Sequence, residues 1–331
     1  MIIKKLRSVR STLLFLGITL LIGLIISLGV GAVPLTPAEV LQALFRNSSK
    51  TVYETIIWDF RLARVLLVCL CGAALSASGV AFQGLFRNPL ADPFVVGASG
   101  GAALGATLSA VFGASIPMGI AGFLGALAAV LLVYSIAESS NYGSIAALLM
   151  AGAALSTMLS AIVTLLLILR EEVLYEVFAW LMGGFAGRSW SHLRQALLVA
   201  PLGIVIIWLM VRPLDALAAG EESAEALGLN LRQTRFMIIV GASLATAAAV
   251  AVSGIIGFVG LIAPHIARTL VGAKHAKTLP ISMLLGALLL LLADGFARTI
   301  MAPVELPVGV FTALLGGPFF LFLLRKGRNI I

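Results

Sequence analysis

The sequence predicts an all-α integral membrane protein with about ten transmembrane helices, and three observations support this fold class. Of its 331 residues, 61% are hydrophobic and only 11% are charged, and the mean hydropathy is +1.12. Soluble domains contain ~45–50% apolar and ~25% charged residues. The apolar residues form continuous runs, whereas the strands of a membrane barrel alternate apolar and polar residues. Most of these runs are long enough to cross the ~30 Å hydrocarbon layer as helices.

Short polar segments separate the apolar runs, so we expect one transmembrane domain, residues 1–331, without a flexible linker. The runs lie at roughly 12–33, 62–83, 94–112, 117–137, 144–169, 194–212, 234–256, 257–271, 280–300 and 308–324. The first follows a basic segment, as in a signal peptide, but it extends from Leu13 to about Val33 and is too long for one. We therefore expect an uncleaved first span with its N-terminus inside.

The charge distribution indicates a membrane orientation and argues against nucleic-acid binding. The net charge is +8, but the lysines and arginines cluster at the ends of the runs, as the positive-inside rule expects. With ten spans and an inner N-terminus, most of the 22 basic residues fall in inner segments, so both termini are predicted to be cytoplasmic. Cys69 and Cys71 would point to different sides of one helix, which predicts neither a disulfide nor a metal site.

No catalytic or cofactor-binding pattern is present. The three histidines are isolated along the chain, and HExxH, GxSxG and P-loop motifs are missing. The sequence therefore predicts no catalytic residue, no metal site and no cofactor of its own.

A faint internal echo suggests an inverted repeat of the kind common in transporters. The segment that begins at Ser78, SGVAFQGLFRNPLADPFVVG, and the one that begins at Ser253, SGIIGFVGLIAPHIARTLVG, share Pro and Gly at the same offsets. One function that the sequence allows is therefore a secondary transporter that needs no partner subunit. Its ion site would need an intramembrane acid, and Asp294 is the acidic candidate well inside a span.

An acidic stretch, GEESAEALGLN at 220–230, interrupts the apolar pattern within a predicted inner segment at 213–231. Its composition favours a short helix that ends at Gly228. The glutamates near its start suit the positive end of the helix dipole. Its apolar residues Ala224, Leu227 and Leu229 need a partner surface. A solvated loop, or a helix on lipid headgroups, is the alternative.

Three segments together resemble the FecCD family, the membrane permeases of ABC importers for iron-siderophores, haem and vitamin B12. They are RLARVLLVCLCGAALSASGVAFQGLFRNPLADPFVVGASGGAALGA (61–106), GFVGLIAPHIARTLVG (257–272) and ELPVGVFTALLGGPFFLFLLRK (305–326). The resemblance covers nearly the whole chain. It implies a permease subunit in a bacterial or archaeal cytoplasmic membrane that takes up a large metal chelate.

The resemblance also implies partners. These are a second copy of the chain (or a close homologue), two ATPase subunits that bind ATP and Mg²⁺, and a periplasmic or lipid-anchored solute-binding protein. The 213–231 segment matches the loop that fits a groove in the ATPase. The residues expected to contact it are Glu221, Glu222, Ala224, Glu225, Leu227 and Gly228.

The family pattern implies further sites by position. Arg61, Arg64 and Arg298 match arginines that meet glutamates of the binding protein, although each could instead pair locally, for example with Asp59 or Asp294. An inner gate would involve Asn88, Leu90, Ser139, Ser140 and Asn141, where an ordinary turn is the alternative. The fifth span would line the path with Met150, Ser156, Met158 and Ser160, since methionine offers an adaptable apolar surface.

Overall fold

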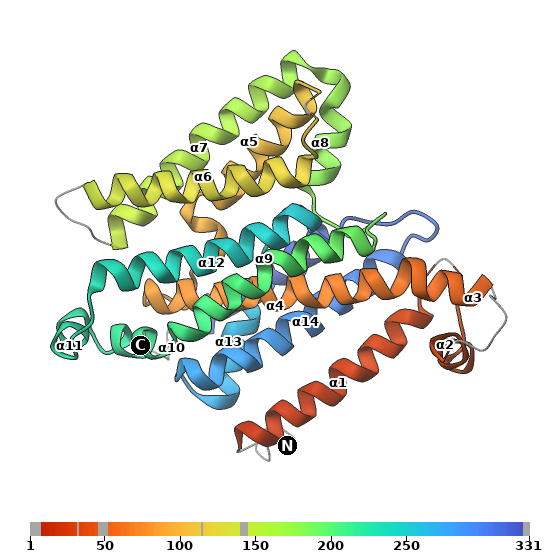
Figure 1. Ribbon diagram of the computed structural model, residues 1–331, viewed down its shortest axis with the longest axis horizontal. Helices are drawn as coiled ribbons and strands as arrows, with labels where there is room; N and C mark the ends of the chain where they lie inside the picture. The colour runs from red at the N-terminus through yellow and green to blue at the C-terminus, as the bar shows by residue number, and fades with distance from the viewer. Residues whose placement is uncertain (1–7, 32, 46–51, 114, 140–144, 327–331) are drawn as a thin grey trace.

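The computed structural model describes residues 8–31, 33–45, 52–113, 115–139 and 145–326, and its elements in these ranges are all helices. Figure 1 shows most of them running side by side along one direction. In chain order they are α1 (Val9–Gly29), α2 (Pro37–Leu44), α3 (Val52–Thr55), η2 (Ile56–Arg61), α4 (Leu62–Leu85), η3 (Pro93–Val96), α5 (Ala98–Val111), α6 (Met118–Ser139), α7 (Ile145–Leu169), η4 (Glu171–Val173), α8 (Leu174–Leu181), α9 (Trp190–Leu209), α10 (Val211–Ala218), α11 (Glu221–Ala226), α12 (Leu231–Ser253), α13 (Val259–Val271), α14 (His275–Thr299) and α15 (Val308–Lys326).

The all-α membrane fold predicted from the sequence is confirmed. Within the described residues, seven helical segments are long and apolar enough to cross a membrane, and three shorter apolar helices lie at Ala98–Val111, Val259–Val271 and Val308–Leu321. Each predicted run overlaps one of these segments. The count of ten spans remains a prediction, because α5 and α13, with 14 and 13 residues, fall below the length that a perpendicular crossing needs.

The α4 helix is the centre of the bundle. It packs against α9, α12, α13 and α14, and nearly all of its side chains from Ala63 to Leu85 are buried or half-buried. A Cβ atom on Gly79 would lie 1.7 Å from the Gly260 carbonyl oxygen of α13, and one on Gly72 would lie 2.3 Å from the Gly286 carbonyl oxygen of α14. Small residues therefore set the helix spacing here, as is usual in membrane bundles.

Figure 1 shows α5, α6, α7 and α8 as a group that lies across α12, away from α1 and α14. The same view places α10 and α11 at one end of the bundle and α2 and α3 at the other. We call these the α11 end and the Arg64 end, because Arg64 lies in the first turn of α4, whose last turn reaches the α11 end.

The internal echo does not correspond to a repeated structural unit at the register read from the sequence. Residues from Ser78 to Leu85 continue α4 before the chain leaves the helix, whereas the segment from Ser253 leaves α12 and enters α13 at Val259. Pro89 lies in a turn and Pro264 inside a helix, so the shared proline and glycine offsets arise in different local structures.

Candidate functional site

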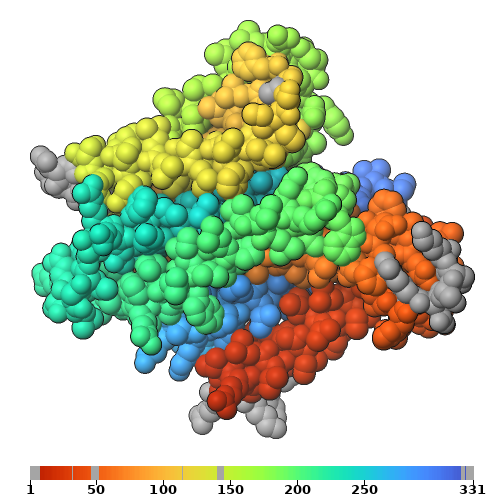
Figure 2. Space-filling model, in the orientation of Figure 1, coloured from red at the N-terminus to blue at the C-terminus, as the bar shows by residue number. Residues whose placement is uncertain are grey.

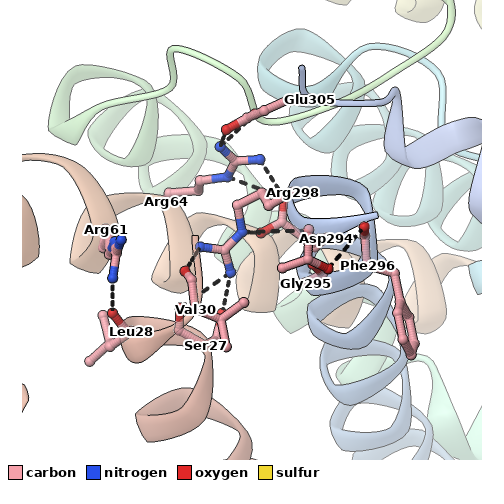
Figure 3. A network of polar contacts seen from close by, with 11 residues as sticks. Ser27, Leu28, Val30, Arg61, Arg64, Asp294, Gly295, Phe296, Arg298 and Glu305 are labelled. Atoms are coloured by element: carbon pink, nitrogen blue, oxygen red, sulfur yellow. Dashed lines mark hydrogen bonds and ion pairs between the residues drawn. The ribbon is translucent and has the colours of Figure 1, made fainter. Parts of the chain in front are cut away.

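The Arg64 end contains a buried network of ion pairs, shown in Figure 3. The Arg64 guanidinium lies 2.8 Å from a carboxylate oxygen of Asp294 and 2.8 Å from one of Glu305. Arg298 lies 3.1 Å from the other Asp294 oxygen, four residues along α14. The Asp294 side chain is fully buried. Because two arginines flank it, this acid is not available as the single ion-binding carboxylate that a secondary transporter would need.

The other two predicted docking arginines also use their side chains within the chain. The Arg61 guanidinium donates to the Leu28 carbonyl oxygen at 2.7 Å and to the Val33 carbonyl oxygen. The Arg298 guanidinium donates to the Ser27 hydroxyl at 2.6 Å. These bonds satisfy carbonyl and hydroxyl groups at the end of α1, which would otherwise lack partners. They tie α1 to α4 and α14.

The three predicted docking arginines do not form an exposed positive patch on the described chain. Arg61, Arg64 and Arg298 are at most 9% exposed, and Arg64 and Arg298 share the pairing with Asp294 that was the local alternative. All three nevertheless line a cavity of about 410 Å³ at this end. A role in docking thus stays a prediction, and a partner's carboxylate would have to enter the cavity to meet them.

Two charged residues that line this cavity, Glu305 and Arg188, were not predicted from the sequence to belong to a functional site. Glu305 opens the third family-like segment, but only the fold places its carboxylate on Arg64. Arg188, in the loop between α8 and α9, also lines the cavity, and its guanidinium lies 3.2 Å from the ring of His192. Burial lowers the pKa of the Arg188 guanidinium, which stays charged at neutral pH because the ordinary arginine pKa is so high.

At the α11 end, the acidic stretch forms the short helix that was predicted, and it ends as predicted. Gly228 has φ +80° and donates to the Glu225 carbonyl oxygen at 2.8 Å, and Leu229 donates to the Ala224 carbonyl oxygen at 3.1 Å. This pair of bonds is a Schellman motif, which favours glycine at its left-handed position.

The six residues predicted to contact the ATPase divide between two faces of α11. Ala224 is fully buried and therefore faces the rest of the chain. The Glu221 carboxylate lies 2.8 Å from Arg87 and 2.7 Å from Arg235. The remaining members are exposed, and Leu227 is 72% exposed. These exposed members are Glu222, Glu225, Leu227 and Gly228. They form an acidic surface with one large apolar side chain. The region of α11 lies at the left edge of Figure 2.

The first predicted gate segment, 86–92, connects α4 to η3 at the α11 end. Asn88 accepts a hydrogen bond from the Leu90 backbone N–H at 2.9 Å, as in an Asx turn. Burial raises the pKa of the Asp92 carboxyl, although the backbone N–H groups of Phe94 and Phe258 act in the opposite direction. The segment is thus an ordered turn, and its role as a gate stays a prediction.

The second predicted gate segment is described in part. Ser139 ends α6, and its hydroxyl donates to the Ile136 carbonyl oxygen at 2.9 Å, whereas Ser140 and Asn141 lie outside the described residues.

The predicted pathway helix, α7, lies at the surface of the chain. Met150 is 73% exposed and Met158 is 53% exposed, Ser160 is exposed and Ser156 is half-buried. None of these side chains lines any of the five main cavities in the described part of the single chain. A path along this face would therefore require a second subunit to close it.

Among the described residues, no group of three or more His, Cys, Asp or Glu side chains could hold a metal ion. The long apolar helices, with a charged network at one end and an acidic helix at the other, are those of a multi-pass membrane protein. Comparisons with known proteins identify it more closely. The model of the FecCD transport family matches residues 19–326, and the chain belongs to this family.

Relatives match along most of the chain. The hemin transport system permease protein HmuU of Yersinia pestis is 40% identical, with 96% of each chain covered. The cobalamin import system permease protein BtuC of Halobacterium salinarum is 41% identical over 82% of this chain and 74% of its own. A solved inward-facing structure of a metal-chelate type ABC transporter matches with a TM-score of 0.86 at 36% identity, covering 96% of this chain and 99% of that one.

Proposed function

We propose that the chain is the transmembrane permease subunit of an ATP-driven importer, working as a dimer in a cytoplasmic membrane. The family match over residues 19–326 carries this proposal. The relatives named for haem and cobalamin, and the metal-chelate type transporter of similar structure, support a large metal chelate as substrate. Both termini are cytoplasmic in this proposal, and so is the α11 end.

The ATPase subunit binds the exposed surface of α11 in this proposal. Leu227 supports this assignment, because a largely exposed leucine beside two exposed glutamates suits a partner surface more than water or anionic lipid. The binding protein meets the Arg64 end, where the arginine-lined cavity offers cationic partners for its glutamates. The substrate passes between two copies of the chain, along the exposed face of α7.

The test is ATP-dependent uptake by the chain and its cognate ATPase, reconstituted together in liposomes. Haemin, cyanocobalamin and a ferric siderophore are offered in turn with the binding protein, and one of them should accumulate only when ATP is present. Uptake that an ion gradient drives without any ATPase would contradict the proposal and favour a secondary transporter.

Leu227→Asp isolates the α11 surface within the same experiment. Burying a leucine at an interface contributes ~1.5–3 kcal/mol, so the variant should weaken ATPase binding by about tenfold or more. Leu209→Asn, at an exposed leucine near the end of α9, serves as the control for a polar change that does not touch α11. Equal ATPase affinity for both variants would exclude this surface.

A further inference from the structure

We propose that Glu221 is a positioning residue that transmits movement of α11 to the 86–92 segment through its ion pair with Arg87. This inference rests on the proposed function, because it assumes that an ATPase moves α11. It assigns Glu221 a role different from its neighbours on the helix. Those neighbours contact the ATPase, whereas Glu221 binds the chain's own arginines.

The geometry gives Glu221 two partners from different parts of the chain. One carboxylate oxygen lies 2.8 Å from Arg87, the second residue of the 86–92 segment, and the other lies 2.7 Å from Arg235 on α12. Both distances are typical of charge-assisted hydrogen bonds, which are stronger than hydrogen bonds between neutral groups. One carboxylate therefore joins the acidic helix both to the predicted gate segment and to a membrane-spanning helix.

The α11 helix is positioned to move as a unit. It lies between Gly220, with φ +120°, and Gly228, with φ +80°, and no atom crowds the Cβ position of either within 3.4 Å. The preceding helix is fixed more firmly. The Asp215 carboxylate on α10 accepts from the His275 backbone N–H at 2.9 Å and lies 2.6 Å from the His275 ring. A force on α11 is therefore expected to turn it about the two glycines rather than to displace α10.

Arg87 supplies an independent observation. It has φ +49°, in the left-handed region, where a non-glycine residue is uncommon. Its own N–H donates to the Gly84 carbonyl oxygen at 3.3 Å, and the Asn88 N–H donates to the Gln83 carbonyl oxygen at 3.1 Å. The end of α4 is thus a second Schellman motif, with arginine at the position that glycine favours.

This backbone strain indicates that the Arg87 side chain has a use. A left-handed conformation costs a non-glycine residue roughly 1–2 kcal/mol relative to glycine. Glycine would end α4 equally well, so the helix end alone does not require arginine. The ion pair with Glu221 is the contact that glycine could not make. A strained residue that reaches between two proposed moving parts is typical of a switch region.

The alternative is a purely structural pair that holds the α11 end together, and Arg87→Gly separates the two. The variant relieves the backbone strain, so the thermal midpoint of the permease should be unchanged or higher. If the pair transmits movement, the same variant should lose communication between α11 and the 86–92 segment. Glu221→Gln removes the charge from the other side and should show the same defect.

The measurement uses the permease–ATPase complex with a reporter cysteine, Leu90→Cys, after replacement of Cys69 and Cys71 by serine. The rate of maleimide labelling is compared without nucleotide and after addition of ATP and vanadate. Arg87→Gly and Glu221→Gln should each shrink the ratio of the two rates by about two- to fivefold, as expected for loss of one partly exposed ion pair. The double variant should resemble Glu221→Gln alone, because that single change already removes the pair with Arg87, together with the pair with Arg235.

Arg170→Gln is the matched control, because it removes an exposed 3.1 Å pair with Glu172 that does not touch α11. Arg170→Gln should give the same ratio of labelling rates as the Leu90→Cys reporter complex that carries no further substitution. The inference is overturned if Arg87→Gly and Glu221→Gln keep that value, or if their defects multiply in the double variant. Two other outcomes would contradict the proposed function itself, and therefore also this inference. One is that the permease and the ATPase form no complex. The other is that the labelling rate at Leu90→Cys does not change with nucleotide when no other residue of the network is substituted.

Discussion

At the residue scale, Arg64 links two acidic residues at its end of the bundle. It pairs with two carboxylates, one fully buried on α14 and one half-exposed after that helix. A buried charge that loses its partner is strongly destabilising, whereas an exposed pair contributes little. The stability of this end should therefore respond much more to Arg64 than to an exposed arginine.

Arg64→Ala should lower the free energy of unfolding by about 1.5–3 kcal/mol, because buried Asp294 loses its charge-assisted hydrogen bonds to Arg64 while it keeps the pair with Arg298. The measurement is unfolding of the purified permease in mixed micelles. Arg170→Ala, which removes an exposed pair, should cost only about 0–1 kcal/mol. Equal losses for both variants would show that the Arg64 network does not hold the fold together.

Glu305→Gln should speed association with the binding protein, because it removes an anion that already neutralises Arg64 in the cavity. Charges of this kind act mainly on encounter rate and orientation. The measurement is the association rate at two salt concentrations. The gain should shrink at 1 M salt, where the Debye length falls to ~3 Å. An association rate that changes neither with Glu305→Gln nor with the salt concentration would contradict docking at this cavity.

The sequence could identify these arginines but not the direction in which they point. Arg64 and Asp294 are 230 residues apart, and Arg64 and Glu305 are 241 apart, so no local spacing relates them. Helical spacing placed Arg61 and Arg64 on one face, but burial depends on α1 and α14, which only the fold brings together. Local pairing with Asp294 was foreseen as an alternative, whereas Glu305 and Arg188 were not.

At the scale of the element, α4 packs by glycine contacts that leave no room for a side chain. Gly79→Ala should destabilise the permease by about 1–3 kcal/mol or more, because its Cβ would meet the backbone of α13, which cannot move aside as a side chain could. Thermal unfolding in detergent measures the effect. Gly17→Ala in α1, where no atom lies within 4 Å, should be neutral or stabilising by up to ~1 kcal/mol. Stabilisation by both changes would contradict the close packing of α4.

Single elements were the part of the fold that the sequence predicted best. Continuous apolar runs fix where helices form, and the acidic stretch with Gly228 fixed both the existence and the end of α11. The inward face of α11 was not predictable. The α11 helix packs against α10 and α12, and Ala224 is fully buried. The sequence of α11 alone does not show which of its faces these helices cover.

At the scale of the whole molecule, the exposed face of α7 and the 86–92 segment require a second copy in the proposed dimer. A single cysteine at Asn88, with Cys69 and Cys71 replaced, should crosslink two copies in one nucleotide state and not in another. Crosslinking of the assembled transporter before and after addition of ATP and vanadate tests this. If Asn88→Cys forms no crosslink in any state, the 86–92 segment lies away from the dimer axis.

The Arg64–Asp294 pair can form only late in the synthesis of the chain. A ribosome that adds ~5–20 residues per second completes the 230 residues between the two partners in roughly 10–50 s. During that interval α4 is already synthesised with an arginine whose buried partner does not yet exist. Nascent chains that stop before α14 should therefore keep their Arg64 end unpacked and open to proteases. Biogenesis of this end then depends on the last quarter of the chain.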